Sequence, residues 1–437
     1  MKKSMILAAA AAIVLSACAK IETEKFVRDN DVISFGAYTG KSVTKSGTAG
    51  ELTTNGANST TSLQTTGFGV FAYQTTGTAA FAEPNFMYNT KVYGSSWTYD
   101  ITKYWPNQIQ AGGTDGQNPK AQADQADKVS FFAYGPYVAH SSAANGTVAD
   151  NTYGITAFSK NSDTGDPKVT YTVSNDLDKQ VDLVWGVADP TNGITWNNVA
   201  GTSVNIGAGM PYIGLQKPAI DTKIKFYFRH ALSQLKLQAV AAYNQVNAGG
   251  TAQDGVKITI EKVELTVPGM TQSAVLNLNN TTANTPKWEA VSGGATTTDL
   301  SLTVSGDNIN ADLKDAGDGK KASEQPDGVT ATAQDVITAG KYYTIIPTST
   351  STDVTVKVTY YVTTDDPDLK DGFSRVKNVI SHDVTFANGF AANKKNSIKM
   401  ILGISEVKFE AEVTDWDSTA VEQEVNLPIN TPAPSNP

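Results

Sequence analysis

The chain has 437 residues, of which 40% are hydrophobic and 18% charged, and its formal net charge is −9 at pH 7. This length is enough for two or three domains, and this apolar content is enough for a substantial core. The acidic balance, with no run of Lys or Arg longer than a pair, excludes the basic footprint of a nucleic-acid-binding protein.

The N-terminus has the features of an export signal. Two lysines precede an apolar run at 5–15 that is too short to span a bilayer, and the sequence LSAC follows at 15–18. This stretch resembles a bacterial lipoprotein signal, in which residues 1–17 are removed and Cys18 is lipidated; an ordinary secretory signal that contains a cysteine is the alternative. Cys18 is the only cysteine, so no intramolecular disulfide is expected. Acyl chains on Cys18 would anchor the protein stably in membrane lipid.

Strand-like segments then recur, separated by polar turns. Residues 18–31 are interpreted as a tether, and the first strand is expected at 32–39, with Ile33, Phe35 and Ala37 on one face. A long Ser/Thr/Gly-rich loop at 40–66 follows and is accessible to proteolysis. Further strands are expected at 67–74, 86–93, 97–100, 128–137, 181–188 and, as two halves, 223–243.

A second series of strands begins after a Gly- and Asn-rich linker candidate at 245–255. These strands are expected at 256–269, 272–280, 341–349, 353–364, 382–386 and 397–416. Their clearest alternation is Val354, Val356, Val358 and Tyr360, which indicates one buried face. The sequence therefore predicts an all-β protein with two antiparallel β-sandwich domains, 32–245 and 256–416, and a tail at 417–437.

The tail itself carries a strand pattern. In VEQEVNLPIN at 421–430, Val421, Val425, Leu427 and Ile429 share one parity, while Glu422, Glu424 and Asn426 share the other. Such a strand either folds back on its own domain as an edge strand or is donated to another chain.

The sequence contains no evident catalytic or metal-binding constellation. The motifs HExxH, GxSxG, the P-loop and CxxC do not occur, and the histidines are few and widely spaced. His230 is predicted to be a partly buried imidazole with its hydrogen bonds satisfied, rather than a catalytic base. The acidic segments at 307–312 and 365–372 lack EF-hand spacing, and the second predicts a turn. We expect neither an enzyme nor a cofactor.

Aromatic residues crowd together in WTYDITKYWPN at 97–107. Trp97, Tyr99, Tyr104 and Trp105 either form a platform that stacks on a sugar or pack a strand end into the core.

Six segments resemble, in order, landmarks of the fimbrillin-like proteins of Bacteroidales. They are GFGVFAY at 67–73, NFMYNTKV at 85–92, WTYDITKYWP at 97–106, KVSFFAYGPY at 128–137, FYFRHALSQLKLQ at 226–238 and VKFEAEVTDW at 407–416. The resemblance implies two tandem transthyretin-like β-sandwich domains. It also implies a lipoprotein subunit of cell-surface fimbriae, located at the outer membrane. The implied partners are other fimbrial subunits, including anchor and tip proteins, and a receptor or glycan on a host or bacterial surface.

The resemblance also implies assembly by strand exchange. A protease removes the first strand, here 32–39 with its plug Ile33, Phe35 and Ala37, and the C-terminal strand of another subunit fills the groove. Shaft subunits of this family are typically cut after arginine, whereas the loop at 40–66 has Lys41 and Lys45 but no arginine, and Arg28 precedes the strand. The subunit is therefore either cut after a lysine, with Lys45 preferred, or stays uncut as an anchor or cap.

Other functions remain open from the sequence. A surface glycan-binding lipoprotein that never polymerises would use the aromatic cluster, and its binding would weaken when Trp97 or Trp105 is replaced by Ala. A surface glycosidase is disfavoured because no acid/base pair can be named. The sequence DST at 417–419 resembles a short acceptor motif for O-glycosylation in these bacteria.

Overall fold

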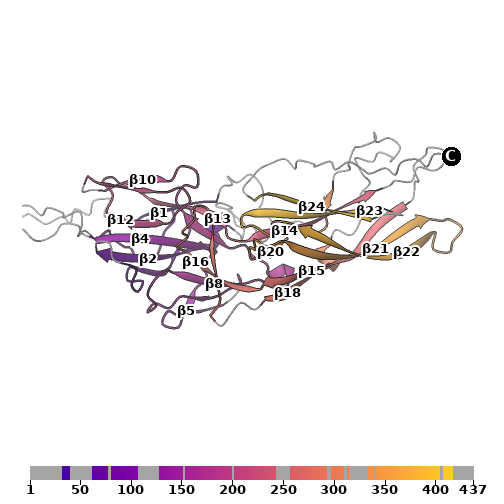
Figure 1. Ribbon diagram of the computed structural model, residues 1–437, viewed down its shortest axis with the longest axis horizontal. Helices are drawn as coiled ribbons and strands as arrows, with labels where there is room; N and C mark the ends of the chain where they lie inside the picture. Colours follow the sequence, from indigo (N-terminus) through magenta and orange to yellow (C-terminus); the bar gives the residue numbers. More distant parts are fainter. Residues whose placement is uncertain are drawn as a thin grey trace, which may run out of the picture.

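The computed structural model of the protein describes residues 32–39, 62–76, 80–106, 127–150, 153–198, 201–242, 256–292, 297–309, 313, 333–338, 341–403 and 407–416. These residues form β-sheets joined by turns, and the predicted all-β fold is confirmed. The short helices are α2 (Leu63–Thr66), η2 (Leu177–Lys179) and η3 (Gly306–Asn308). The molecule is elongated, with β2 and β4 towards one end and the β21–β22 hairpin at the other (Figure 1). Among the described residues, no helix is long and apolar enough to cross a membrane.

A seven-stranded sheet carries the first strand of the protein at its edge, in the order β1-β13-β9-β4-β2-β3 with β12 beside β4. Its strands are β1 (Phe35–Tyr38), β2 (Phe68–Thr76), β3 (Met87–Val92), β4 (Asp127–Gly135), β9 (Val184–Val187), β12 (Tyr212–Leu215) and β13 (Ile224–His230). The central strands β2 and β4 are almost continuously apolar, and most of their side chains are buried. This composition is typical of a sheet that is covered on both faces.

One face of this sheet packs against a six-stranded sheet with the order β17-β16-β8-β7-β6-β5. Its strands are β5 (His140–Ser142), β6 (Thr147–Val148), β7 (Ile155–Phe158), β8 (Lys168–Thr172), β16 (Ser273–Asn277) and β17 (Lys287–Ala290). The ring centroids of Phe71 on β2 and Phe158 on β7 lie 6.1 Å apart, which shows how side chains of the two sheets meet.

The other face of the seven-stranded sheet is covered by loop segments and a hairpin. This hairpin pairs β10 (Ile194–Asn197) with β11 (Ser203–Ile206). A separate buried cluster lies beneath it and contains Phe35, Phe131, Phe226, Trp105 and Trp196 among others. The first strand therefore belongs to a core of its own, on the opposite face from the sandwich interior.

The C-terminal part of the chain forms two further sheets. The five-stranded sheet contains β14 (Ser233–Ala242), β19 (Gln334–Asp335), β20 (Tyr343–Ile345), β23 (Lys394–Gly403) and β24 (Val407–Asp415). The four-stranded sheet contains β15 (Val256–Thr271), β18 (Thr297–Ser305), β21 (Thr352–Asp365) and β22 (Phe373–Phe386). Val354, Val356, Val358 and Tyr360 of β21 are all buried, which confirms the predicted alternation.

Strand pairing crosses the predicted division at 245–255 in both directions. Strand β14 pairs with β23, whereas β16 returns to pair with β8 in the sheet nearer the N-terminus. The chain passes between these sheets at 231–232, directly between β13 and β14. The linker candidate lies outside the described residues, so the two-domain division stays a prediction.

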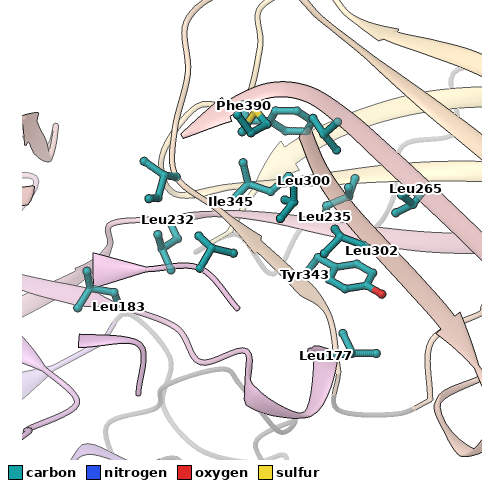
Figure 2. Close-up of a cluster of buried hydrophobic side chains, with 14 of the residues drawn as sticks. Leu177, Leu183, Leu232, Leu235, Leu265, Leu300, Leu302, Tyr343, Ile345 and Phe390 are labelled. Carbon is teal, nitrogen blue, oxygen red and sulfur yellow. The ribbon is translucent and has the colours of Figure 1, made fainter. Parts of the chain in front are cut away.

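The junction between the N-terminal and C-terminal sheets is packed and hydrogen-bonded. One buried cluster joins the two sets of sheets, and it includes Leu177, Leu183, Leu232 and Tyr343 (Figure 2). The Ala231 amide donates to the Leu183 carbonyl at 2.8 Å. Pairing is antiparallel throughout the described strands except for β1 with β13 and β14 with β23, which are parallel. Each parallel pair joins strands that are far apart in sequence, as parallel pairing requires.

Candidate functional site

The first strand lies at the edge of the seven-stranded sheet, and we call the site that it fills the groove. Among the described strands, β1 pairs only with β13, in parallel, and Phe35 stands opposite Ile224. The Ile224 amide donates to the Ser34 carbonyl at 2.9 Å. Because β1 lies at an edge, its departure would break its ladder with β13 but no pairing between the other strands of the sheet.

The side chains of β1 and the residues before it plug the groove. Ile33 and Phe35 are fully buried, and Ala37 is partly buried against the same cluster. The Phe35 ring lies 5.5 Å from the Tyr99 ring, 6.0 Å from Phe131 and 6.2 Å from Phe226, measured between centroids. The structure thus brings together the three residues that the sequence assigned to one face. Whether this strand is displaced stays a prediction.

A second segment, residues 97–105, holds the start of the first strand from the other side; we call it the clasp. The Ile33 amide donates to the Lys103 carbonyl at 2.9 Å, and Val32 forms an isolated antiparallel bridge with Tyr104. The Tyr99 hydroxyl donates to the Ile33 carbonyl at 2.7 Å and accepts from the Lys103 amide at 3.1 Å.

Both ends of the clasp are anchored in the core by tryptophan. The Trp105 ring is buried and lies 5.7 Å from Trp196, while the Trp97 ring lies 5.6 Å from Phe68. Trp97 has a positive φ of 53° at the end of the turn that begins at Gly94, a conformation that costs free energy and that its core packing offsets. The indoles therefore face the core, which favours the packing interpretation of the aromatic cluster over a sugar-stacking platform.

The electrostatics of the groove keep its hydroxyl donors neutral. Burial raises the pKa of the Tyr99 hydroxyl above its ordinary value of 10.0, and the hydrogen bond from Lys103 partly opposes that rise. Tyr99 is therefore protonated at neutral pH and able to donate to Ile33. On the outer face, the Lys225 ammonium lies 5.6 Å from the centroid of the Tyr38 ring, which suits a cation–π contact.

Several residues assigned from the sequence lie outside the described residues. They are the lipidation candidate Cys18, the cleavage candidates Arg28, Lys41 and Lys45, the donor residues Val421, Val425, Leu427 and Ile429, and the motif at 417–419. Their roles stay predictions.

His230 and the acidic segment at 365–372 have structural rather than catalytic or metal-binding surroundings. The His230 Nδ1 lies 2.6 Å from the Asp182 Oδ2, both side chains are buried, and the Trp416 ring stacks on the imidazole at 4.1 Å. The imidazole is thus hydrogen-bonded as predicted, and it is more fully buried than the partly buried position that the sequence indicated. Residues 366–372 form the turn between β21 and β22, closed by an Asp366 amide bond to the Gly372 carbonyl at 2.9 Å. Among the described residues, no group of three or more His, Cys, Asp or Glu side chains is placed to hold a metal ion.

Sequence reasoning missed the clasp as part of the groove. Nothing in the spacing of 97–105 shows that the Tyr99 hydroxyl reaches the main chain at Ile33, because the contact spans 66 positions. The available signal was the density of aromatic residues in this segment, which indicated packing but not the partner.

The fold is shared with known structures. The sequence matches no protein-family model, and no curated protein matches it. A fimbrial protein from Bacteroides vulgatus is 21% identical, with a TM-score of 0.53, over 88% of this chain and 99% of that one. A candidate cell adhesion protein from Bacteroides uniformis is 14% identical over 88% of this chain and 98% of that one, with a TM-score of 0.39. Another from Bacteroides ovatus is 12% identical over 90% and 98%, with a TM-score of 0.37. The last two TM-scores are too low to support an argument. The chain therefore has the fold of the Bacteroides vulgatus fimbrial protein, as its resemblance to the fimbrillin-like proteins implies.

Proposed function

We propose that the protein is a structural subunit of a cell-surface fimbria that polymerises by strand exchange and supports adhesion. The observation that carries this proposal is the first strand, which is an edge strand near the N-terminus whose apolar side chains are buried in the groove. The shared fold with a fimbrial protein supports the same conclusion.

Loss of the first strand would leave a groove that another strand can fill. The pockets of Ile33 and Phe35 are lined by buried apolar side chains, and emptying a core pocket of this kind typically costs about 3–5 kcal/mol for Phe. The main-chain edge of β13 would also lose its ladder partner. A strand with apolar residues at alternate positions would restore both interactions.

The tail at 421–430 has the pattern that this groove requires. Val425, Leu427 and Ile429 repeat at the same two-residue interval as Ile33, Phe35 and Ala37. Donation of this tail to a second copy is a head-to-tail contact that does not close on itself, so it builds a filament.

Export and maturation complete the proposal. Lipidation of Cys18 would hold the precursor at the outer membrane, and a cut in the loop after β1, with Lys45 preferred over Lys41, would free the first strand. A cut at Arg28 would release the lipid and leave the groove occupied. A subunit that stays uncut would serve as an anchor or a cap, and a tip position would require only one of the two exchange elements.

The test is the N-terminal sequence of the protein sheared from its native cells, together with its migration on a gel without boiling. We expect a start near Ser46 and a ladder of heat-sensitive multimers. A lipidated Cys18 on a strictly monomeric species would rule out the shaft role.

Matched variants of the tail distinguish strand donation from non-specific association. Leu427→Asp puts a charge on the apolar face of the tail and is expected to abolish the ladder. Asn426→Asp puts the same charge on the polar face and is expected to retain it. Equal loss in both variants would contradict donation of this segment.

A further inference from the structure

We propose that the clasp at 97–105 is the gate of the groove: it retains the strand that fills the groove through main-chain hydrogen bonds and sets how fast that strand leaves. This inference rests on the proposed function, because it assigns a regulator to the same groove. The two ends of residues 32–38 are held by different partners. Strand β1 is held by β13, whereas Val32 and Ile33 are held by the clasp.

The hydrogen bonds of the clasp go to the main chain of the strand rather than to a particular side chain. The Lys103 carbonyl accepts from the Ile33 amide, and the Tyr99 hydroxyl donates to the Ile33 carbonyl. Any strand that runs in the direction of β1 offers the same amide and carbonyl groups at this position, whatever its side chains. The clasp therefore holds the first strand through groups that do not depend on its side chains, while the pockets beneath it select the side chains.

The Tyr99 hydroxyl links the clasp to the strand. It lies between the strand and the clasp, since it also accepts from the Lys103 amide at 3.1 Å. The Tyr99 ring packs edge-on against Phe35. One side chain thus joins the main-chain contact at Ile33 to the filled pocket at Phe35.

The clasp is anchored at its ends and has exposed side chains between them. Trp97 and Trp105 anchor its ends in the core, whereas Ile101 is 71% exposed and Tyr104 is 52% exposed. A segment with few buried contacts between two fixed points opens at a lower free-energy cost than the sheet it covers. The groove can therefore open at the clasp without disrupting the strands below.

The test compares Tyr99→Phe with Tyr104→Phe in the full chain. Tyr99→Phe removes the hydroxyl bond to Ile33 but keeps the ring against Phe35, whereas Tyr104→Phe removes an exposed hydroxyl from the same segment. Native-state hydrogen exchange of the amides at 33–38 reports opening of the uncut strand. We expect about 3- to 10-fold faster exchange in Tyr99→Phe, the range expected for one lost hydrogen bond, and no change in Tyr104→Phe. Equal protection in both variants would overturn the gate, and unchanged circular dichroism confirms that each variant is folded.

A second measurement separates failure of the gate from failure of strand exchange. A specific protease site is placed in the loop at 40–61, the chain is cut, and a synthetic peptide of residues 421–430 is added. We expect the peptide to displace the first strand about 3- to 10-fold faster in Tyr99→Phe than in Tyr104→Phe. Equal rates would overturn the gate. If the peptide displaces the strand in neither variant, strand exchange fails, and the hydrogen-exchange result on the uncut chain still decides the gate.

Discussion

Trp416 is predicted to lock the C-terminal end of β24 onto the N-terminal sheets. Its side chain is fully buried, its ring stacks on His230 at 4.1 Å with an interplanar angle of 8°, and it meets Tyr342 edge-on at 5.7 Å. The Trp416 amide donates to the Asn393 carbonyl at 2.9 Å. Replacing a buried Trp with Ala typically costs about 3–5 kcal/mol. Because this indole joins both sets of sheets and fills its site completely, we expect Trp416→Ala to lose about 4 kcal/mol of unfolding free energy.

Urea unfolding followed by far-ultraviolet circular dichroism measures this loss. Trp416→Phe is the graded variant: it keeps a ring against His230 and removes an indole N–H that has no hydrogen-bond partner among the described residues, so we expect a loss of only about 1–2 kcal/mol. Val413→Ala on the same strand is the control, since Val413 is 52% exposed and its truncation should cost about 0.5 kcal/mol or less. If Trp416→Ala cost no more than the control, the junction would not depend on this stack.

Three further predictions concern backbone fit and buried hydroxyls. Gly69→Ala should lower the unfolding free energy by about 1–3 kcal/mol in the same urea assay, because its Cβ would lie 2.3 Å from a ring carbon of buried Tyr134. Gly36→Ala should instead raise protection of β1 amides, with about 0.4–1 kcal/mol of stabilisation, because its Cβ would meet Lys225 Cγ at an ordinary 3.6 Å. Burial raises the pKa of Tyr88 to about 12 from the ordinary 10.0 and raises the pKa of several other tyrosines further. The folded state thus keeps protons that the unfolded state releases, so its stability should be complete below about pH 10 and fall as the pH rises towards 12. Tyrosinate absorbance that rises fully near pH 10 with an intact fold would contradict this.

Local patterns predicted the strands and their buried faces well. The alternation of Val354, Val356, Val358 and Tyr360 identified one face of β21, and Ile33 and Phe35 identified the plug. The continuous apolar runs of β2 and β4 predicted strands, but they did not predict that both faces of these strands are buried. The second buried face belongs to a separate core on the far side of the sheet.

Long-range pairing was not predictable from the same patterns. Nothing local in β16 shows that it joins β8 rather than the strands around it, because register and partner choice depend on which edges are free when the sheets assemble. The parallel pairing of β1 with β13 also joins segments from distant parts of the chain. The clasp was missed for the same reason, since Tyr99 reaches Ile33 through tertiary structure alone.

The pockets of the first strand also predict the direction in which the tail enters. The Ile33 and Phe35 side chains are fully buried, whereas the Ala37 position is partly exposed. If the tail ran parallel to β13 as β1 does, Val425 would underfill the Ile33 pocket and Ile429 would overfill the Ala37 position. If the tail ran antiparallel, Ile429 would replace Ile33 with no change in size, and Val425 would meet the partly exposed Ala37 position. Volume-conserving replacement is the better tolerated, and antiparallel pairing is slightly more stable per residue, so we expect antiparallel entry.

The position of Pro428 also agrees with antiparallel entry of the tail. In that direction Pro428 would stand at the position of Ser34 with its main-chain polar groups turned away from β13, because reversing a strand on the same side-chain face also reverses its hydrogen-bonding edge, so its missing N–H costs no bond to β13. Calorimetric titration of tail peptides into a cut chain freed of its first strand tests the direction. We expect Ile429→Ala to weaken binding by about 3 kcal/mol, roughly 100-fold, and Val425→Ala by about 1 kcal/mol or less. The reverse order would show parallel entry. Equal losses would mean that the pockets left by Ile33 and Ala37 do not distinguish the ends of the tail.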